Sequence, residues 1–338
     1  MSTQRPLFEP PKEWIAPQFL PDLSEAKEIA IDLETNDPGI KNTGPGWATN
    51  RGYVAGIAIA VDGWKGYFPI RHEGGGNFDE EILRQQLSKL LVNDADKIFH
   101  NASYDLGWLK RWGVEVKGRC IDTMIAAAVI DENRMPGQYN LNAVARDYIQ
   151  EKKDESLLYE AARAWQIDAK AEMYKLPYQY VGPYAEQDAA MTLRLWNALK
   201  IQIKKQELSS IFELETELLP VLVEMKWRGV RIDLEKANNL KIQIKKEEEI
   251  ILHQLKKEVG FDVEVFAPTS VAKAFDKKGI KYNKSPTGLP SFDKNFLASL
   301  NDPFSSKIVE ARELFKARST FIDSLLKHEH NGRTDTCS

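Results

Sequence analysis

The chain has 338 residues, of which 43% are hydrophobic and 28% are charged, the composition of an ordinary globular protein long enough for two domains. Its net charge of −4 excludes a uniformly basic nucleic-acid-binding surface, and no run of eighteen apolar residues predicts a membrane span. Met1 to Trp14 is polar and proline-rich, unlike a secretory signal, and neither Cys120 nor Cys337 has a zinc-like partner. We therefore expect no membrane association and a reducing, cytoplasmic location.

The charge is unevenly distributed along the chain. Residues 1–200 carry 23 Lys and Arg against 29 Asp and Glu, a net charge of −6, whereas residues 201–338 carry 23 against 21, a net charge of +2. An acidic first half and a mildly basic second half are compatible with a metal-using site beside a region that contacts phosphates.

The first 200 residues alternate between short apolar runs and helical patterns, which predicts a mixed α/β sheet flanked by helices. The predicted strands are Ile29–Thr35, Gly52–Asp62, Lys65–Ile70 and Lys97–His100, and the second and third are joined by a hairpin turn at Asp62-Gly63. The predicted helices are Asp79–Val92, Leu106–Trp112, Ile121–Ile130, Leu141–Ile149, Ser156–Trp165 and Val181–Lys200.

Beyond Lys200 the sequence becomes mainly helical. The predicted helices are Leu208–Lys226, Leu234–Lys257 and Ser305–Lys327, and a polar loop covers Asn283–Pro290. We place the domain boundary between residues 206 and 207, which gives domains of residues 1–206 and 207–338.

The first strand carries a pair of acids near its carboxyl end. Side chains alternate along a strand, so Asp32 and Glu34 project to the same face, roughly 7 Å apart along the chain. Two carboxylates this close repel each other unless a cation lies between them, and oxygen donors suit Mg²⁺ or Mn²⁺. The Asp-x-Glu pattern occurs four times in the chain, so alone it indicates only two solvated acids.

Two later motifs supply further acids. Asp105 follows Asn101 and Tyr104 at a strand-to-helix junction, and Tyr184 precedes Asp188 by one helical turn. Four acids and a tyrosine in this order can form a two-metal phosphodiester site. We expect Asp32 to bridge both metals, with the remaining roles as follows: Glu34 and Asp188 complete the first site, Asp105 supports the second through water, and Tyr184 orients the attacking hydroxide.

The motifs Ile-Asp-Leu-Glu-Thr, His-Asn-Ala-Ser-Tyr-Asp and Tyr-Ala-Glu-Gln-Asp resemble the three exonuclease motifs of the DEDDy group, which has a ribonuclease-H-like fold. The resemblance implies 3′→5′ removal of nucleoside monophosphates from single-stranded or frayed 3′ DNA with two divalent metal ions. Cys120-Ile-Asp-Thr-Met resembles the helix after the second motif, where we expect Asp122 to be structural.

The second half resembles the start of the polymerase region in family A DNA polymerases. Glu213 to Asp233 is similar to its first segment, Glu310 to Asp323 to a later thumb helix, and Lys284 to Phe292 to the loop between them. The resemblance implies an exonuclease domain followed by a partial helical thumb, the proofreading part of a family A polymerase from a phage-like source, acting in bacterial or infected-host cytosol.

The sequence departs from the family after Asn331-Gly-Arg, where family A polymerases continue into palm and fingers. We therefore expect no nucleotide addition by this chain alone, and either a truncated polymerase or one part of a polymerase encoded in two parts. In the latter case a second polypeptide carrying palm and fingers would be its partner.

DNA contacts are expected from basic residues of the last long helix and from residues beside the second acidic motif. The candidates are Arg312, Lys316 and Arg318 on the helix, Lys277, Lys278, Lys281 and Lys284 in the basic loop region, and Asn101 and Tyr104 at the cleft. Trp108, His72 and His100 are predicted to be packed or hydrogen-bonded rather than to serve as ligands.

Two alternatives remain open. An RNase D-like 3′ exoribonuclease would use the same acids, although the polymerase-like second half disfavours it. A non-catalytic DNA-binding or assembly module that completes a split polymerase would not need four acids facing phosphate.

Overall fold

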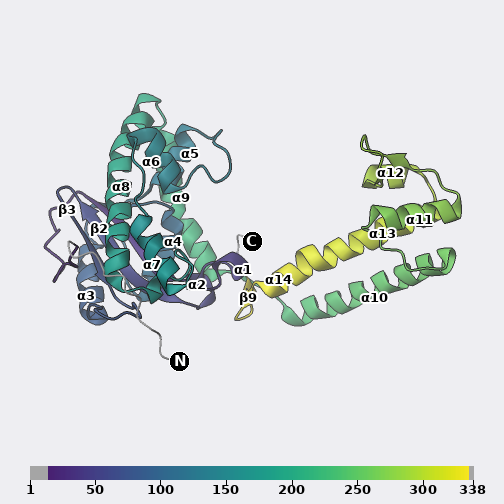
Figure 1. Ribbon diagram of the computed structural model, residues 1–338, viewed down its shortest axis with the longest axis horizontal. Helices are drawn as coiled ribbons and strands as arrows, with labels where there is room; N and C mark the ends of the chain where they lie inside the picture. The colour runs from purple at the N-terminus through teal and green to yellow at the C-terminus, as the bar shows by residue number, and fades with distance from the viewer. Residues whose placement is uncertain (1–13, 335–338) are drawn as a thin grey trace. The chain divides into compact units, whose positions relative to one another are not determined.

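The computed structural model describes residues 14–334, which form two compact units (Figure 1). The first unit ends at Gly229 and the second begins at Val230. Cys337 lies outside the described residues.

A five-stranded mixed sheet forms the centre of the first unit, with the strand order β3-β2-β1-β4-β5. The strands are β1 (Glu28–Asn36), β2 (Tyr53–Val61), β3 (Trp64–Pro69), β4 (Asp96–Phe99) and β5 (Cys120–Asp122). The first three pair antiparallel, as the predicted hairpin at Asp62-Gly63 requires, whereas β4 and β5 add in parallel on the other side of β1. This arrangement confirms the α/β class and the mixed sheet predicted from the sequence.

Helices cover both faces of this sheet (Figure 1). They are α1 (Ile40–Thr43), α2 (Gly46–Thr49), α3 (Glu80–Leu90), α4 (Ala102–Trp112), α5 (Thr123–Ile130), α6 (Leu141–Ile149), α7 (Ser156–Trp165), the 3-10 helix η1 (Met173–Lys175), α8 (Tyr178–Lys205) and α9 (Ser209–Arg228).

Alternation along β1 assigns its side chains to two separate cores. Ile29, Ile31 and Leu33 pack against α3, α4 and α9, whereas Ala30 belongs to the core formed with α5, α6, α7 and α8. Asp32 therefore lies on the α8 face of the sheet, and Glu34 follows it there two residues later. This register directs both acids toward the longest helix of the unit.

The structure corrects the predicted elements at several boundaries. The predicted helix Ile121–Ile130 is divided between β5 and α5, because Cys120–Asp122 pairs in parallel with β4. Helix α8 begins three residues before the predicted Val181 and continues five residues past Lys200. The predicted helix Ser305–Lys327 is interrupted by a π-helical turn, a local irregularity that side-chain periodicity does not reveal.

The second unit is mainly helical. Its helices are α10 (Leu234–Val259), α11 (Pro268–Lys278), α12 (Lys294–Ser299), α13 (Pro303–Lys316), the π-helical turn η2 (Ala317–Ile322) and α14 (Asp323–Lys327). Its short strands are β6 (Val230–Arg231), β7 (Asn283–Lys284), β8 (Pro290–Ser291), β9 (Glu329–His330) and β10 (Arg333–Thr334). Helices α10 and α13 run side by side and enclose a core that includes Leu255, Phe275 and Ile308 (Figure 1).

The boundary expected at residues 206/207 falls between α8 and α9. The compact first unit extends further, to Gly229, because Leu219 and Val223 of α9 are buried in its core. None of the helices within residues 14–334 combines the length and the apolar character needed to cross a bilayer.

Candidate active site

Asp32 and Glu34 lie on the α8 face of the sheet, opposite small residues of the neighbouring strand β2. Their partners across the antiparallel pair are Ala58 and Gly56, which are among the smallest residues available. A side chain at Gly56 is excluded, because a Cβ there would lie 2.0 Å from the Tyr67 hydroxyl oxygen. The register of the pair shifts between Glu34 and Thr35, so a bulge ends the regular ladder directly after the second acid.

Asp105 is carried by the first turn of α4 and is buried. Its Oδ1 accepts a hydrogen bond of 3.1 Å from the Leu33 backbone N–H, the peptide group between the two acids of β1. This bond fixes α4 to β1 and places the third acid beside the first two.

The start of α4 is held by Asp122, the last residue of β5. Its carboxylate accepts backbone N–H groups of Asn101 at 3.0 Å, Ala102 at 2.8 Å and Met124 at 2.8 Å. Asn101 has a φ of 73°, in the left-handed region, so the chain turns sharply between β4 and α4. Asp122 has the structural role expected of it, because it fixes this turn.

Helix α8 supplies Tyr184 and Asp188, one turn apart on one face. Asp188 is only 3% exposed, and its Oδ2 accepts a hydrogen bond of 2.5 Å from Lys153 Nζ. Its Oδ1 is buried and has no hydrogen-bond partner among the described residues. A buried carboxylate oxygen without a partner is costly, so this atom is suited to a cation.

The pKa values of all four acids are raised in this enclosed environment, chiefly by burial. Burial, followed by the charge of Asp188, raises the pKa of Asp32 to about 7. Burial also raises the pKa values of Glu34 and Asp105 well above their usual range, with the charge of Asp32 as the next cause in each. Burial raises the pKa of Asp188 as well, against the opposing effect of Lys153. Burial is the main cause of these shifts, and repulsion between the acids adds to it for Asp32, Glu34 and Asp105, so a bound cation would stabilise the charged forms.

The acids are not yet arranged as a formed metal site. Within residues 14–334, no three Asp, Glu, His or Cys side chains stand as a cluster that could hold a metal ion. One oxygen of Asp188 is bound to Lys153 and one oxygen of Asp105 to Leu33. The donors are nevertheless the oxygen ligands that Mg²⁺ and Mn²⁺ prefer, and the unpartnered Oδ1 of Asp188 is available, so the residues fit such a metal.

These groups open onto one hollow of about 560 Å³, called here the catalytic hollow. Asp32, Glu34, Tyr184 and Asp188 line it, with other residues from the surrounding loops and helices: Asn101, Tyr104, His100, Tyr139, Lys153 and Lys170. The structure thus brings together the strand acids and the α8 pair predicted from the sequence, with Asp105 buried beside them.

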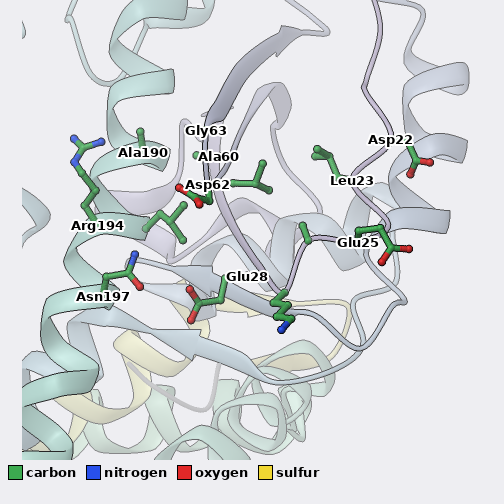
Figure 2. Close-up of a pocket in the computed structure, with 14 residues that line it drawn as sticks. Asp22, Leu23, Glu25, Glu28, Ala60, Asp62, Gly63, Ala190, Arg194 and Asn197 are labelled. Carbon is green, nitrogen blue, oxygen red and sulfur yellow. The ribbon is translucent and has the colours of Figure 1, made fainter.

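A second, larger hollow of about 830 Å³ lies at the other end of the strands, between the start of β1, the β2–β3 turn and α8 (Figure 2). Two of its charged side chains, Glu28 and Arg194, are paired with neighbours. Glu28 accepts hydrogen bonds from Trp196 and Lys200, and Arg194 pairs with Glu151. The acids that line this hollow are exposed or half-buried, whereas Glu34 and Asp188 in the catalytic hollow are buried.

Two lysines of the catalytic hollow were missed in the sequence analysis. Lys153 lies in the loop between α6 and α7, and Lys170 lies in the loop after α7, where its Nζ is 3.9 Å from the centre of the Tyr184 ring. Neither belongs to a periodic pattern or a recognised motif. Only the fold brings them to the acids.

The predicted DNA-contact residues differ in how free their side chains are. Asn101 is exposed at the rim of the catalytic hollow, whereas the Tyr104 hydroxyl is engaged with Thr35 Oγ1 at 2.7 Å and Asp37 Oδ2 at 3.1 Å. In the second unit, Lys316 is exposed. Both arginines there are engaged: Arg312 donates to the carbonyls of Val265 and Phe292, and Arg318 pairs with Glu248 and Asp323.

The packed roles predicted for three aromatic residues are confirmed. Trp108 is 1% exposed in the core. His72 bonds to the Tyr67 hydroxyl and the Leu176 carbonyl, and His100 bonds to Thr123 and the Tyr139 carbonyl. Burial lowers the pKa of each histidine to about 4, so neither carries a proton at neutral pH.

The chain is similar to several known proteins. A family model described as 3′-5′ exonuclease matches residues 14–204. The chain is 36% identical over 341 residues to a DNA-directed DNA polymerase of Pseudomonas phage M6, covering 98% of this chain and 51% of the relative. It is 28% identical over 314 residues to DNA polymerase I of Borreliella burgdorferi, covering 91% of this chain and 32% of the relative.

Among solved structures, the POL domain of Pol1 from M. smegmatis, in complex with DNA primer-template and dNTP, matches with a TM-score of 0.67 and 18% identity. That match covers 92% of this chain and 49% of the other. At this identity the likeness concerns the fold, an α/β exonuclease-type unit followed by a helical region. The chain spans about half the length of the phage polymerase that it matches.

Proposed function

Because the chain belongs to the 3′–5′ exonuclease family of the family A DNA polymerases, we propose that it is a metal-dependent exodeoxyribonuclease that releases nucleoside monophosphates from DNA 3′ ends. The observation that supports this most is the convergence of Asp32, Glu34, Tyr184 and Asp188 on one hollow, with Asp105 buried beside it. Three buried carboxylates and the half-buried Asp32, all with raised pKa values, form a poor binding surface for phosphate unless cations neutralise them.

The acids divide between two metal positions in this proposal. Asp32 contributes to both, Glu34 and Asp188 complete the first, and Asp105 supports the second through water. Two divalent ions, when bound, would lower the pKa of the attacking water and stabilise the attacking and leaving oxygens. Mg²⁺ or Mn²⁺ is the proposed species, because all donors are carboxylate oxygens.

Tyr184 orients the attacking water. Burial, followed by the charge of Asp188, raises the pKa of its hydroxyl well above the usual range, so the group keeps its proton and acts through hydrogen bonding. Its ring is held by Lys170, whose Nζ lies 3.9 Å from the ring centre. A fixed phenol of this kind can hold a water molecule in line with the scissile bond.

The DNA strand is proposed to enter past Asn101 and the Tyr104 ring and to stack on exposed aromatic surface. On the second unit, Lys316 is the best placed of the three predicted residues to meet a phosphate, because its side chain is exposed. Arg312 and Arg318 already direct part of their donor groups to the partners described above, so they are less free to meet a phosphate. Metal-dependent removal of mispaired 3′ ends by the proofreading part of a polymerase is the biological role that this supports.

Digestion of a 5′-labelled single-stranded DNA by the full chain tests the proposal. With Mg²⁺ or Mn²⁺ we expect a ladder that shortens from the 3′ end, and none with EDTA. A matched RNA of the same sequence should be degraded more slowly, and faster digestion of the RNA would support an RNase D-like enzyme instead. No ladder from the folded protein would leave the alternative of a DNA-binding or assembly module that completes a polymerase with a second polypeptide carrying palm and fingers.

The Tyr184→Phe variant is expected to digest DNA about 10- to 100-fold more slowly, because one oriented hydrogen bond to the attacking water is lost. Its affinity for Mn²⁺ should stay within about threefold of the wild type, since no carboxylate is removed. Tyr148→Phe removes a hydroxyl from a half-buried tyrosine of α6 outside the hollow and serves as the matched control. Equal rates for Tyr184→Phe and Tyr148→Phe would show that the Tyr184 hydroxyl takes no part in the reaction.

A further inference from the structure

The ion pair between Lys153 and Asp188 is unusual among those of this protein. The two side chains are 11% and 4% exposed, and Nζ lies 2.5 Å from Oδ2. Most other ion pairs described in the chain lie on its surface, where they contribute little. A buried pair, in contrast, is costly to break from one side, because the remaining charge is left without a partner.

The loop that carries Lys153 is fixed to α8 on both sides of the lysine. Gln187, the neighbour of Asp188, accepts a hydrogen bond from the Asp154 backbone N–H at 3.0 Å and donates to the Lys152 carbonyl at 3.5 Å. The Lys153 backbone N–H donates to Asn142 Oδ1 at 3.2 Å. These contacts fix the backbone from which the Lys153 side chain extends to Asp188.

Lys170 provides a natural comparison within the same hollow. Its Nζ pairs with Glu155 at 2.6 Å and lies over the Tyr184 ring, but none of its ion pairs within residues 14–334 involves one of the four acids. Both lysines therefore contribute positive charge near the site, while Lys153 alone of the two occupies a carboxylate oxygen of the cluster.

An ammonium and a divalent cation cannot occupy the same side of one carboxylate oxygen. Lys153 holds Oδ2 of Asp188, and the other oxygen of that carboxylate is buried without a partner in the described part of the chain. A metal ion held by the β1 acids and by the buried Oδ1 of Asp188 would share one carboxylate with the ammonium of Lys153, and the two cations would repel each other and compete for its charge.

We propose that Lys153 is an exchangeable counter-ion of the acid cluster, which neutralises Asp188 in the metal-free protein and withdraws when a divalent cation binds. The inference rests on the proposed function, since it concerns the same acids. Its consequence is that Lys153 sets the metal concentration at which the acids bind a metal ion. In the metal-free protein it also offsets the repulsion between the four clustered carboxylates.

Binding of Mn²⁺ to the full chain without DNA, at pH 8, measures this exchange directly. Lys153→Met removes the competing charge and is expected to bind Mn²⁺ about tenfold more tightly, a change within the range that groups bonded to metal ligands contribute. Lys153→Arg retains the charge and should stay within about threefold of the wild type. Lys170→Met, which changes the net charge equally without touching Asp188, is the matched control and should change the affinity by less than about threefold.

Thermal unfolding supplies the second readout. Metal-free Lys153→Met should unfold at a lower temperature than the wild type, because it lacks the ion pair with Asp188. Saturating Mn²⁺ should remove that difference, because the ion pair is then absent from the wild type as well. Lys153→Gln repeats both measurements, so the result does not depend on the folding of one variant. Unchanged or weaker Mn²⁺ binding by Lys153→Met and Lys153→Gln, or an equal gain in Lys170→Met, would overturn the exchange.

These readouts separate the inference from the nuclease proposal. A DNA ladder together with unchanged Mn²⁺ affinity in the Lys153 variants would contradict the exchange of Lys153 for a metal ion and support the nuclease activity. Tighter Mn²⁺ binding by the Lys153 variants, without a DNA ladder from the wild type, would support the exchange and contradict the nuclease activity.

Discussion

At pH 8 the Asp32→Asn variant is expected to digest DNA at least about a thousandfold more slowly than the wild type, while its metal-free form unfolds at a higher temperature. The activity is lost because Asp32 is the acid proposed to contact both metal ions, whose stabilisation of charge in the transition state contributes several kcal/mol. The stability is gained because asparagine has nearly the same shape and cannot carry the charge that the other acids repel.

The raised pKa of Asp32 determines the direction in which stability changes with pH. The pKa of Asp32 is about 7 in the folded protein, above its ordinary value of 3.8, so the folded state retains a proton that the unfolded state releases. The contribution of Asp32 to the free energy of unfolding of the metal-free wild type should therefore fall as the pH rises from about 4 to about 7 and change little above that. Allowing for water that reaches this partly exposed carboxyl, Asp32 should account for about 2 kcal/mol of the fall.

Urea unfolding at a series of pH values, with and without Mn²⁺, measures the effect. Asp32→Asn should show a shallower fall and should be more stable than the wild type at pH 8, whereas the two proteins should converge near pH 4. Asp62→Asn, which neutralises an exposed acid of the larger hollow, is the matched control (Figure 2). Retained digestion by Asp32→Asn, or a loss of stability at pH 8, would contradict the assignment of Asp32.

The central acids could be predicted because local geometry decides where they point. The alternation of β1 alone directs Asp32 and Glu34 to one face, and one helical turn alone stacks Tyr184 with Asp188. The structure adds that these two faces meet in one hollow. The sequence supported that step only through the order of the motifs and their resemblance to a known family.

The lysines of the hollow could not be predicted, since their positions depend on tertiary contacts. Lys153 belongs to a polar loop in which nothing marks one residue above its neighbours, and it reaches Asp188 because Gln187 fixes that loop to α8. The same limit applies to Arg312 on α13. Its sequence position predicts a phosphate contact, but its guanidinium donates to two backbone carbonyls that only the folded unit brings within reach.

Asp122→Ala is expected to lower the free energy of unfolding by about 3 to 4 kcal/mol, the largest loss of stability that we predict for a single substitution. The carboxylate accepts three backbone N–H groups, those of Asn101, Ala102 and Met124, in a buried position where water cannot easily replace it. A buried donor left without its acceptor costs about 1 to 3 kcal/mol, and partial relaxation keeps the total below the sum.

The loss should also reach the active site, because the three bonds fix the left-handed turn at Asn101 from which α4 carries Asp105. Urea unfolding should show a lower midpoint with an unchanged slope, and digestion of DNA should be slower even where the variant is fully folded.

Asp122→Asn keeps an oxygen for two of the donors but directs an amide toward Ala102, so it should be less stable than the wild type and more stable than Asp122→Ala. Asp131→Ala removes a single bond, to Asn133 in an exposed turn, and should cost less than about 1 kcal/mol. Equal effects of Asp122→Ala and Asp131→Ala would show that the turn before α4 is fixed by its own backbone, and Asp105 would then be held by its bond to Leu33 alone.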